Sequence, residues 1–135
     1  MTTNIGGDKN TSVGFQSLQA NSEGNKNVAV GMYSMYANTT ASDNVAVGYE
    51  SMKVNTTGTR NIAIGVGAYD AADTESDNLA IGYDALGGAI AGGEKNLAIG
   101  NYSLKTNTSG DANTCLLYTS PSPRDLSTSR MPSSA

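Results

Sequence analysis

The sequence contains no histidine and no tryptophan, and only one cysteine and one phenylalanine among its 135 residues. The lack of histidine excludes His-based acid–base chemistry, Ser-His-Asp triads and histidine metal sites. Charged residues make up only 15% of the chain, and the formal net charge is −4. Because a phosphate-binding surface needs clustered Lys and Arg, nucleic acid is not an expected partner.

Long apolar runs are also missing. No segment of the sequence approaches the roughly 18 consecutive apolar residues of a membrane-spanning helix, so direct membrane insertion of this segment is not expected. Residues 1–10 lack the basic and apolar regions of a signal peptide. If the protein is exported, we expect its export signal to lie outside this sequence.

Small and turn-forming residues dominate what is present. The chain has 16 glycines and is rich in Asn, Thr, Ser and Ala, a mixture that disfavours long helices and favours short strands joined by turns. Val, Ile, Leu and Met are not depleted as they are in disordered chains, and they recur at regular intervals. The composition therefore favours a repetitive all-β structure.

A five-residue phrase, Asn-x-Ala-x-Gly, recurs along the chain. Its copies follow a 17-residue period, with a single 18-residue step between Asn78 and Asn96. A degenerate copy begins at Asn10, so six repeats are present and a seventh begins at Asn113. Helix-pair repeats and propeller blades need roughly 33 to 45 residues, so this period predicts a parallel β-roll, a β-solenoid with about 17 residues per coil. The expected structural repeat positions are Asn27, Asn44, Asn61, Asn78, Asn96, Gly31, Gly48, Gly65, Gly82 and Gly100.

The alternation within each phrase predicts two faces of a strand. The second and fourth residues are branched or apolar, as in Val45 and Val47, and we expect them to point into the core while the intervening Ala faces outward. A second bulky row, four residues beyond each Gly, is expected to complete the core. This row consists of Leu18, Met35, Met52, Tyr69, Leu86 and Leu104.

Only about three core side chains per coil is a thin core, so we expect association between chains to add burial. A smooth outward row of alanines is the candidate subunit interface, although Ala at these positions is also compatible with a strand that is merely half exposed. The row consists of Ala29, Ala46, Ala63, Ala80 and Ala98.

Several other residues have two interpretations. The Asn that begins each phrase could form a ladder along the stack or cap a turn. The tyrosines could line an exposed binding face, or close the ends of the coils against neighbouring subunits. The acidic residues between Asp70 and Asp77 favour a solvated turn over a weak cation site. Residues 88–95 lack the Gly-Lys-Ser/Thr of a phosphate loop. We expect no catalytic, cofactor or metal site, and no enzyme activity.

The repeats resemble the Asn-x-Val-Ala-Ile-Gly repeats in the heads of YadA-type trimeric autotransporter adhesins, the hemagglutinin-like head repeat family. Residues 44–49 and 78–83 carry the likeness best. Longer versions with Asn-Thr-Thr-Gly resemble repeats of bacteriophage tail fibres. The 17-residue period is longer than the repeat usual in adhesin heads, and stalk heptads and membrane-anchor strands are missing from the sequence.

This resemblance implies a left-handed parallel β-roll in a homotrimer that attaches to a host cell or matrix surface. The implied partner is a host surface glycan or protein receptor. The implied location is extracellular, at the bacterial cell surface or outer membrane or in a virion tail fibre. Two alternatives are an ice-binding β-solenoid, which would need a flat Thr array, and the non-catalytic stem of a tail-spike polysaccharide depolymerase.

The C-terminal stretch, 115–135, breaks the pattern. All three prolines, the single cysteine and two of the three arginines lie in it. A disordered Ser/Pro-rich tail is one interpretation. The other is that residues 115–125 and 129–135 resemble an in-frame translation of a transposase-based sequencing adapter. The expected organisation is a lead-in over 1–9, a truncated six-coil β-roll over 10–114, and a non-native, disordered tail over 115–135.

Overall fold

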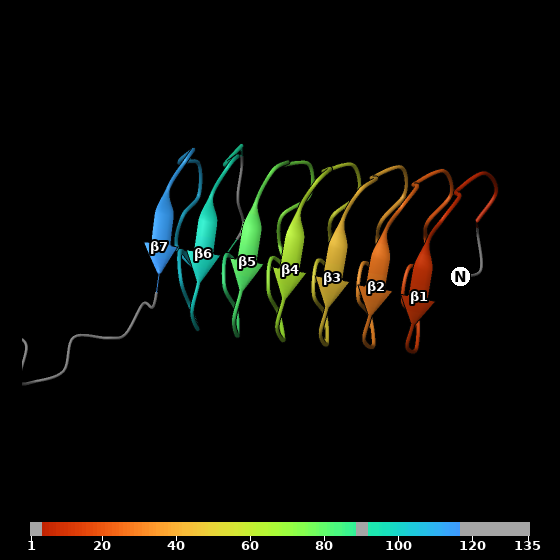
Figure 1. Cartoon of the computed structure of the whole chain (residues 1–135), viewed down its shortest axis with the longest axis horizontal. Helices are drawn as coiled ribbons and strands as arrows, with labels where there is room; N and C mark the ends of the chain where they lie inside the picture. The colour runs from red at the N-terminus through yellow and green to blue at the C-terminus, as the bar shows by residue number, and fades with distance from the viewer. Residues whose placement is uncertain (1–3, 89–91, 117–135) are drawn as a thin grey trace, which may run out of the picture.

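The computed structural model describes residues 4–88 and 92–116. Within them, seven short strands form one parallel sheet, in which every strand pairs with the next along the chain. The strands are β1 Thr11–Val13, β2 Val28–Val30, β3 Val45–Val47, β4 Ile62–Ile64, β5 Leu79–Ile81, β6 Leu97–Ile99 and β7 Thr114–Leu116. They lie side by side in a row, and each coil passes behind the sheet before it returns to the next strand (Figure 1).

The fold is therefore an all-β parallel solenoid of about six turns, which confirms the prediction from the 17-residue period. Equivalent residues of neighbouring coils pair directly, for example Val28 with Val45 and Val45 with Ile62. The 18-residue repeat keeps this register, because Leu79 pairs with Leu97. The extra residue is thus absorbed between β5 and β6 without disturbing the stack.

The core has the opposite orientation from the one predicted for the strands. The alanines at the centre of β2 to β6 are completely buried, whereas Ile62 and Ile64 on either side are each 39% exposed. The prediction that the branched pairs point inward and the alanines outward is therefore wrong. Alternation shows only that the two sets face opposite ways, and a shift of one residue exchanges the faces. The buried row consists of Ala29, Ala46, Ala63, Ala80 and Ala98.

The second bulky row explains why small residues face inward. Leu18, Met35, Met52, Tyr69 and Leu86 are completely buried and form one cluster with the alanines, as predicted for this row, and Leu104 packs against the cluster partly buried. So short a coil encloses a narrow interior. One large side chain from the back wall fills it, so the front wall has room only for a methyl group.

The corners of each coil need unusual backbone conformations. Eighteen non-glycine residues among those described have φ near +48° to +64°, and they recur at the same three positions of the repeat. Such conformations cost about 1–3 kcal/mol each and persist only where the surrounding structure enforces them. Here the coil-to-coil hydrogen bonds supply that constraint, as between the Met35 nitrogen and the Ser51 oxygen at 3.0 Å.

The regular structure extends slightly past the boundaries expected from the sequence. Residues 4–9 already follow the path of a coil, since Gly7 N donates to Asn4 Oδ1 at 3.0 Å as Gly110 N does to Asn107 Oδ1. At the other end β7 continues to Leu116, and Cys115 pairs in register with Ala98. The remainder of the expected tail, 117–135, lies outside the described residues.

Candidate functional site

Asparagines at the first position of the repeat form a buried ladder. The Asn44 amide donates from Nδ2 to the Gly58 carbonyl at 2.8 Å, and its Oδ1 accepts from the backbone N–H of Asn61 on the next coil at 2.8 Å. From Asn10 to Asn78 each of these side chains both caps a turn and joins two coils, so the ladder and the turn cap are roles of the same residue there. Asn96 joins the coils through its Oδ1 alone. The ladder runs through Asn10, Asn27, Asn44, Asn61, Asn78, Asn96 and Asn113.

A second asparagine row is interrupted after Asn55, and in the next coil a tyrosine takes over its role. Asn55 Nδ2 donates to the Gly58 carbonyl at 3.0 Å within its turn. The equivalent residue of the next coil is Ala72, and there the Tyr69 hydroxyl donates to the Glu75 carbonyl at 3.2 Å. Burial raises the pKa of Tyr69, so the phenol stays protonated and keeps its donor. This tyrosine is a core residue and does not belong to an exposed binding face.

Glu75 departs from the solvated turn expected for the acidic residues. Its side chain is buried, with the residue only 5% exposed. Its carboxylate accepts backbone hydrogen bonds from Asp73, Thr74 and, on the next coil, Gly92. Buried carboxylates require such partners. The expectation holds better for Asp73, which is exposed, and Asp77 pairs with an arginine.

An apolar face covers the outer side of the sheet. It is formed by the branched residues on either side of the buried alanines, which are half buried or exposed on every strand from β2 to β6. We call this set the strand face, and it consists of Val28, Val30, Val45, Val47, Ile62, Ile64, Leu79, Ile81, Leu97 and Ile99. Within the described residues it is an aligned double row of Val, Ile and Leu with no charged member.

An aromatic edge runs beside the strand face, at the point in each coil where the chain leaves its strand. Tyr33 makes edge-to-face contacts with Phe15 and Tyr36, each with ring centroids 5.8 Å apart, and with Tyr49 at 6.4 Å. Further along, Tyr83 contacts Tyr102 at 5.2 Å. Such geometry is favourable for aromatic pairs. The structure therefore places these tyrosines on one outer edge, apart from the buried Tyr69.

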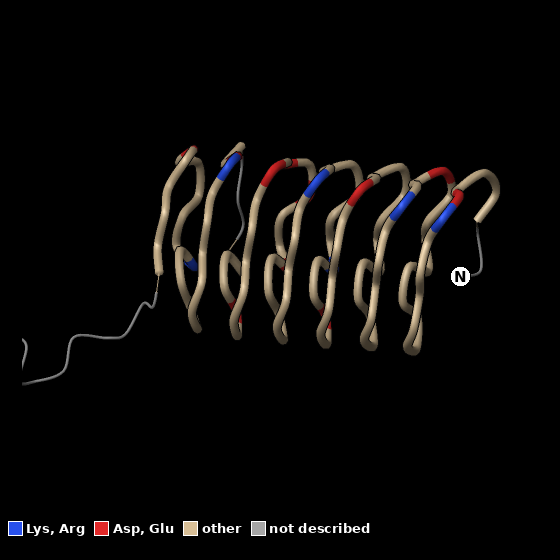
Figure 2. Tube along the Cα trace, viewed as in Figure 1, with Lys and Arg blue, Asp and Glu red and all other residues tan. Residues whose placement is uncertain are grey.

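Charged residues form another row, at the end of each repeat where the chain enters its strand (Figure 2). Arg60 and Asp77 form a bidentate pair, with Nε–Oδ1 at 2.6 Å and Nη2–Oδ2 at 2.9 Å. Hydrogen bonding to the Arg60 guanidinium lowers the pKa of Asp77. A weaker contact joins Lys26 and Asp43 at 3.8 Å. The alternation of signs between these four residues favours the observed register of the coils.

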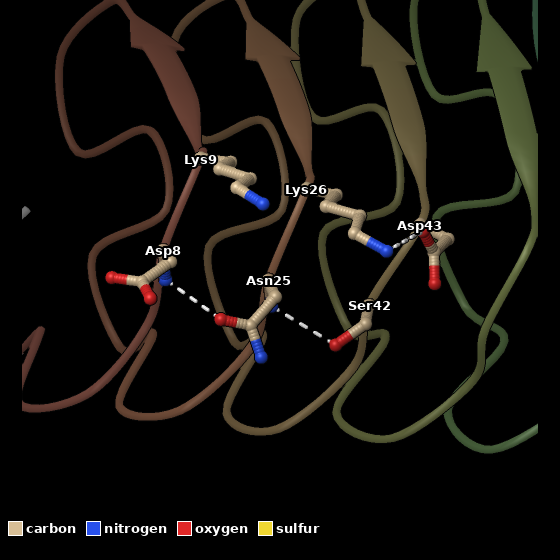
Figure 3. Close-up of a pocket in the computed structure, with 6 residues that line it drawn as sticks. All are labelled: Asp8, Lys9, Asn25, Lys26, Ser42 and Asp43. Carbon is tan, nitrogen blue, oxygen red and sulfur yellow. Dashed lines mark hydrogen bonds and ion pairs between the residues drawn. The ribbon is translucent and has the colours of Figure 1, made fainter.

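The first coils border a shallow, open polar hollow of about 370 Å³ beside this row (Figure 3). Asp8 N donates to Asn25 Oδ1 at 2.7 Å, and Asn25 N donates to Ser42 Oγ at 2.9 Å. These two bonds and the Lys26–Asp43 contact join neighbouring coils along the lining of the hollow. We therefore interpret it as a structural feature of the stack.

A metal-binding group of His, Cys, Asp or Glu side chains and a membrane-spanning helix were both sought in residues 4–88 and 92–116. No group of three or more His, Cys, Asp or Glu side chains there could hold a metal ion. No helix within the same ranges has the length and hydropathy to cross a bilayer. Residues 89–91 of the segment compared with a phosphate loop lie outside the described residues, while the Gly93 carbonyl accepts from Asn78 Nδ2 at 3.0 Å.

The fold and these surfaces define the class: a parallel β-solenoid held by an asparagine ladder, with an apolar strand face and an aromatic edge. Comparisons with protein-family models, with curated proteins and with solved structures gave no match. Any assignment of function therefore depends on the surfaces themselves.

Proposed function

We propose that this chain is a structural and adhesive segment of a left-handed, homotrimeric β-roll fibre that attaches to a host cell or matrix surface. The observation that supports this most is the strand face. Large contiguous apolar patches on a protein surface usually mark contact sites. This face presents a pair of branched apolar side chains on every strand from β2 to β6, with neighbouring strands about 4.8 Å apart. Aligned copies of the chain could therefore repeat one kind of contact along the rod.

The orientation of the strands moves the proposed interface from the alanines to the branched residues. Ala63 is completely buried within its own chain and is not accessible to another subunit. Ile62 and Ile64 flank it and point outward. Three chains arranged around a threefold axis would each cover the strand face of the others, which is a closed symmetry of the kind expected of a homo-oligomer. This interface would bury additional apolar surface, which the narrow core of a single chain cannot provide.

Attachment would then use the surfaces that lie outside this interface. The aromatic edge and the charged row run parallel to the strand face, and a trimer presents three copies of each. Repeated weak sites on a rigid rod gain strength by avidity, which suits a host surface glycan or protein receptor. The resemblance of the repeats to adhesin heads and tail fibres supports an extracellular location on a bacterial surface or virion.

The oligomeric state tests the proposal directly. We expect light scattering to give the mass of three chains for the full-length protein. The control variant Thr57→Lys, which places a lysine on an exposed turn, should give the same mass. Replacing Ile62 and Ile64 together with Lys should give single chains, because lysine ammonium groups cannot be buried unpaired in an apolar interface. Fusion to a trimerising foldon should restore the three-chain mass. A wild-type chain that is folded and monomeric would refute the proposed interface.

Attachment is tested by binding of labelled trimer to an array of glycans and matrix proteins. If avidity is the mechanism, the double lysine variant should lose at least about a hundredfold in apparent affinity, and the foldon fusion should recover it. Equal binding by the monomeric and trimeric forms would contradict an avidity mechanism. No binding by any form to the array would contradict the adhesive assignment.

A further inference from the structure

One coil departs from its neighbours on the aromatic edge. Position six of the repeat is Tyr49 in one coil and Tyr83 two coils later, but Val66 in the coil between them. Position seven is likewise acidic on both sides, and it is Gly67 in the middle. The missing side chains leave a hollow of about 190 Å³, which we call the notch. It is lined by Tyr49, Glu50, Val66, Gly67, Asp70, Tyr83 and Asp84.

The two tyrosines are suitably spaced walls for a cation. They belong to coils two steps apart, so their backbones are separated by about 9.6 Å along the stack. A cation midway between them would lie within the roughly 6 Å over which an aromatic ring attracts a positive charge. Both rings are exposed at the mouth of the notch, at 41% for Tyr49 and 48% for Tyr83.

The charges in the notch are unevenly neutralised. Glu50 is paired with Lys53 at 2.8 Å, and Asp84 is paired with Lys105. Asp70 forms no ion pair in the described part of the chain, and its buried Oδ1 has no hydrogen-bond partner. Partial burial raises the pKa of Asp70, and the nearby Asp84 charge raises it further. These effects outweigh the favourable influence of the Lys53 charge and of a backbone hydrogen bond on the Asp70 carboxylate, so a further positive group beside Asp70 would stabilise the folded state.

We propose that the notch binds a quaternary ammonium group, the choline head of a surface lipid or glycan, with Asp70 as its counter-ion and Tyr49 and Tyr83 as its walls. A lysine ammonium is more strongly hydrated and gains less from aromatic walls. A metal ion fits less well, because no metal-binding group of side chains is found among the described residues. A neutral sugar would leave the Asp70 charge without a positive partner. This inference names a ligand class for the proposed attachment function and rests on it.

The test is a calorimetric titration of the full-length protein with choline. Its matched control ligand is 3,3-dimethylbutan-1-ol, which has the same shape without the charge. We expect choline to bind at least about tenfold more tightly, a difference that corresponds to about 1.4 kcal/mol. Equal affinity for the two compounds, or binding of lactose without binding of choline, would overturn the proposal.

Three variants locate the site. Asp70→Asn should weaken choline binding about tenfold and also raise the melting temperature, a combination that a purely structural residue would not give. Glu23→Gln removes an exposed carboxylate from a turn outside the notch and the charged row, and it should leave choline binding unchanged. Val66→Tyr places a third ring between two that already occupy this position on neighbouring coils, so it should fold and abolish binding. Unchanged binding in either Asp70→Asn or Val66→Tyr would overturn the site.

Two competition experiments distinguish a lipid from a glycan as the source of the choline head. Phosphatidylcholine vesicles report a lipid, and a phosphocholine-substituted oligosaccharide reports a glycan. If the vesicles or the oligosaccharide compete with choline for the notch, the inference is supported; if neither competes, it is overturned. Tighter binding of N-acetyl-lysine methylamide than of choline would also overturn it. Because these titrations do not depend on the mass of the assembly, failure of ammonium binding is distinguishable from failure of the trimer, which light scattering measures separately.

Discussion

Replacing Gly48 with Ala should strongly destabilise the solenoid, although it adds only one methyl group. Gly48 has φ of +140°, a conformation that L-residues rarely adopt. A Cβ on this residue would overlap the carbonyl oxygen of Gly65 on the next coil, far inside the 3.4 Å at which ordinary contacts begin. Because the obstructing atom belongs to the backbone, no side-chain rotation can relieve the overlap.

The expected magnitude has two parts. The unfavourable backbone conformation costs about 1–3 kcal/mol. Relief of the overlap requires the coils to move apart locally, which strains the bonds from Gly48 N to Val30 O and from Gly65 N to Val47 O, each 2.8 Å long. Overpacking of this kind costs about 1–3 kcal/mol. The free energy of unfolding should therefore fall by about 2–6 kcal/mol, a large fraction of the roughly 5–15 kcal/mol typical of a domain.

Two other glycines separate these contributions. Gly92 has φ of +94° but nothing within 4 Å of an added methyl group, so Gly92→Ala should show the backbone cost alone. Gly6 has neither a positive φ nor a neighbour within 4 Å, so Gly6→Ala should be close to neutral. Urea denaturation followed by far-UV circular dichroism gives all three free energies. If Gly48→Ala is no more destabilising than Gly92→Ala, the close approach of the coils at this position is refuted.

Three further predictions use the same urea assay. Asn44→Ala should lower the free energy of unfolding by about 2–6 kcal/mol, because two buried backbone groups lose their partner at about 1–3 kcal/mol each. The control Asn101→Ala should have little effect, because this asparagine is exposed and water can replace its side-chain amide. Equal losses of stability in the two variants would contradict the ladder. Ala63→Val should cost about 1–3 kcal/mol by overpacking the core. Val47→Ala, compared with Ala63→Val on the monomeric double lysine background, should cost less because Val47 is half buried on the outer face of its strand. The reverse order would restore the assignment of the faces that the sequence predicted. Asp77→Asn should remove stability that is present above the ordinary pKa of Asp and lost as the pH falls through the lowered pKa of the folded state. If the free energy of unfolding of the variant falls at low pH in the same way as that of the wild type, the Arg60–Asp77 ion pair does not contribute to stability.

The period alone was enough to predict the solenoid. Hydrogen bonds between coils require equivalent residues to stack, so a regular 17-residue repeat already implies parallel strands in register. The asparagine and glycine positions followed from the same argument. The sequence left open whether the first asparagine of the repeat forms a ladder or caps a turn, and at Asn44 the structure shows both roles.

The faces of the strands could not be obtained in the same way. Alternation in Val45-Ala46-Val47 is identical whichever set faces inward. The choice depends on the width of the interior, which is set by the Met35 and Met52 row on the opposite wall. That row comes from a different part of the coil, so only the folded chain shows that a methyl group is all the space allows.

The departures from the repeat also acquired meaning only in three dimensions. The sequence already places Tyr69 in the bulky core row, but only the structure shows that its hydroxyl replaces a missing asparagine. Val66 and Gly67 look like ordinary variation, yet they empty the space between two rings on coils that are not neighbours. A periodic sequence determines its own architecture because each coil repeats the contacts of the last. Which surfaces remain free for a partner depends on how the walls of the coil meet, and only the tertiary structure decided that.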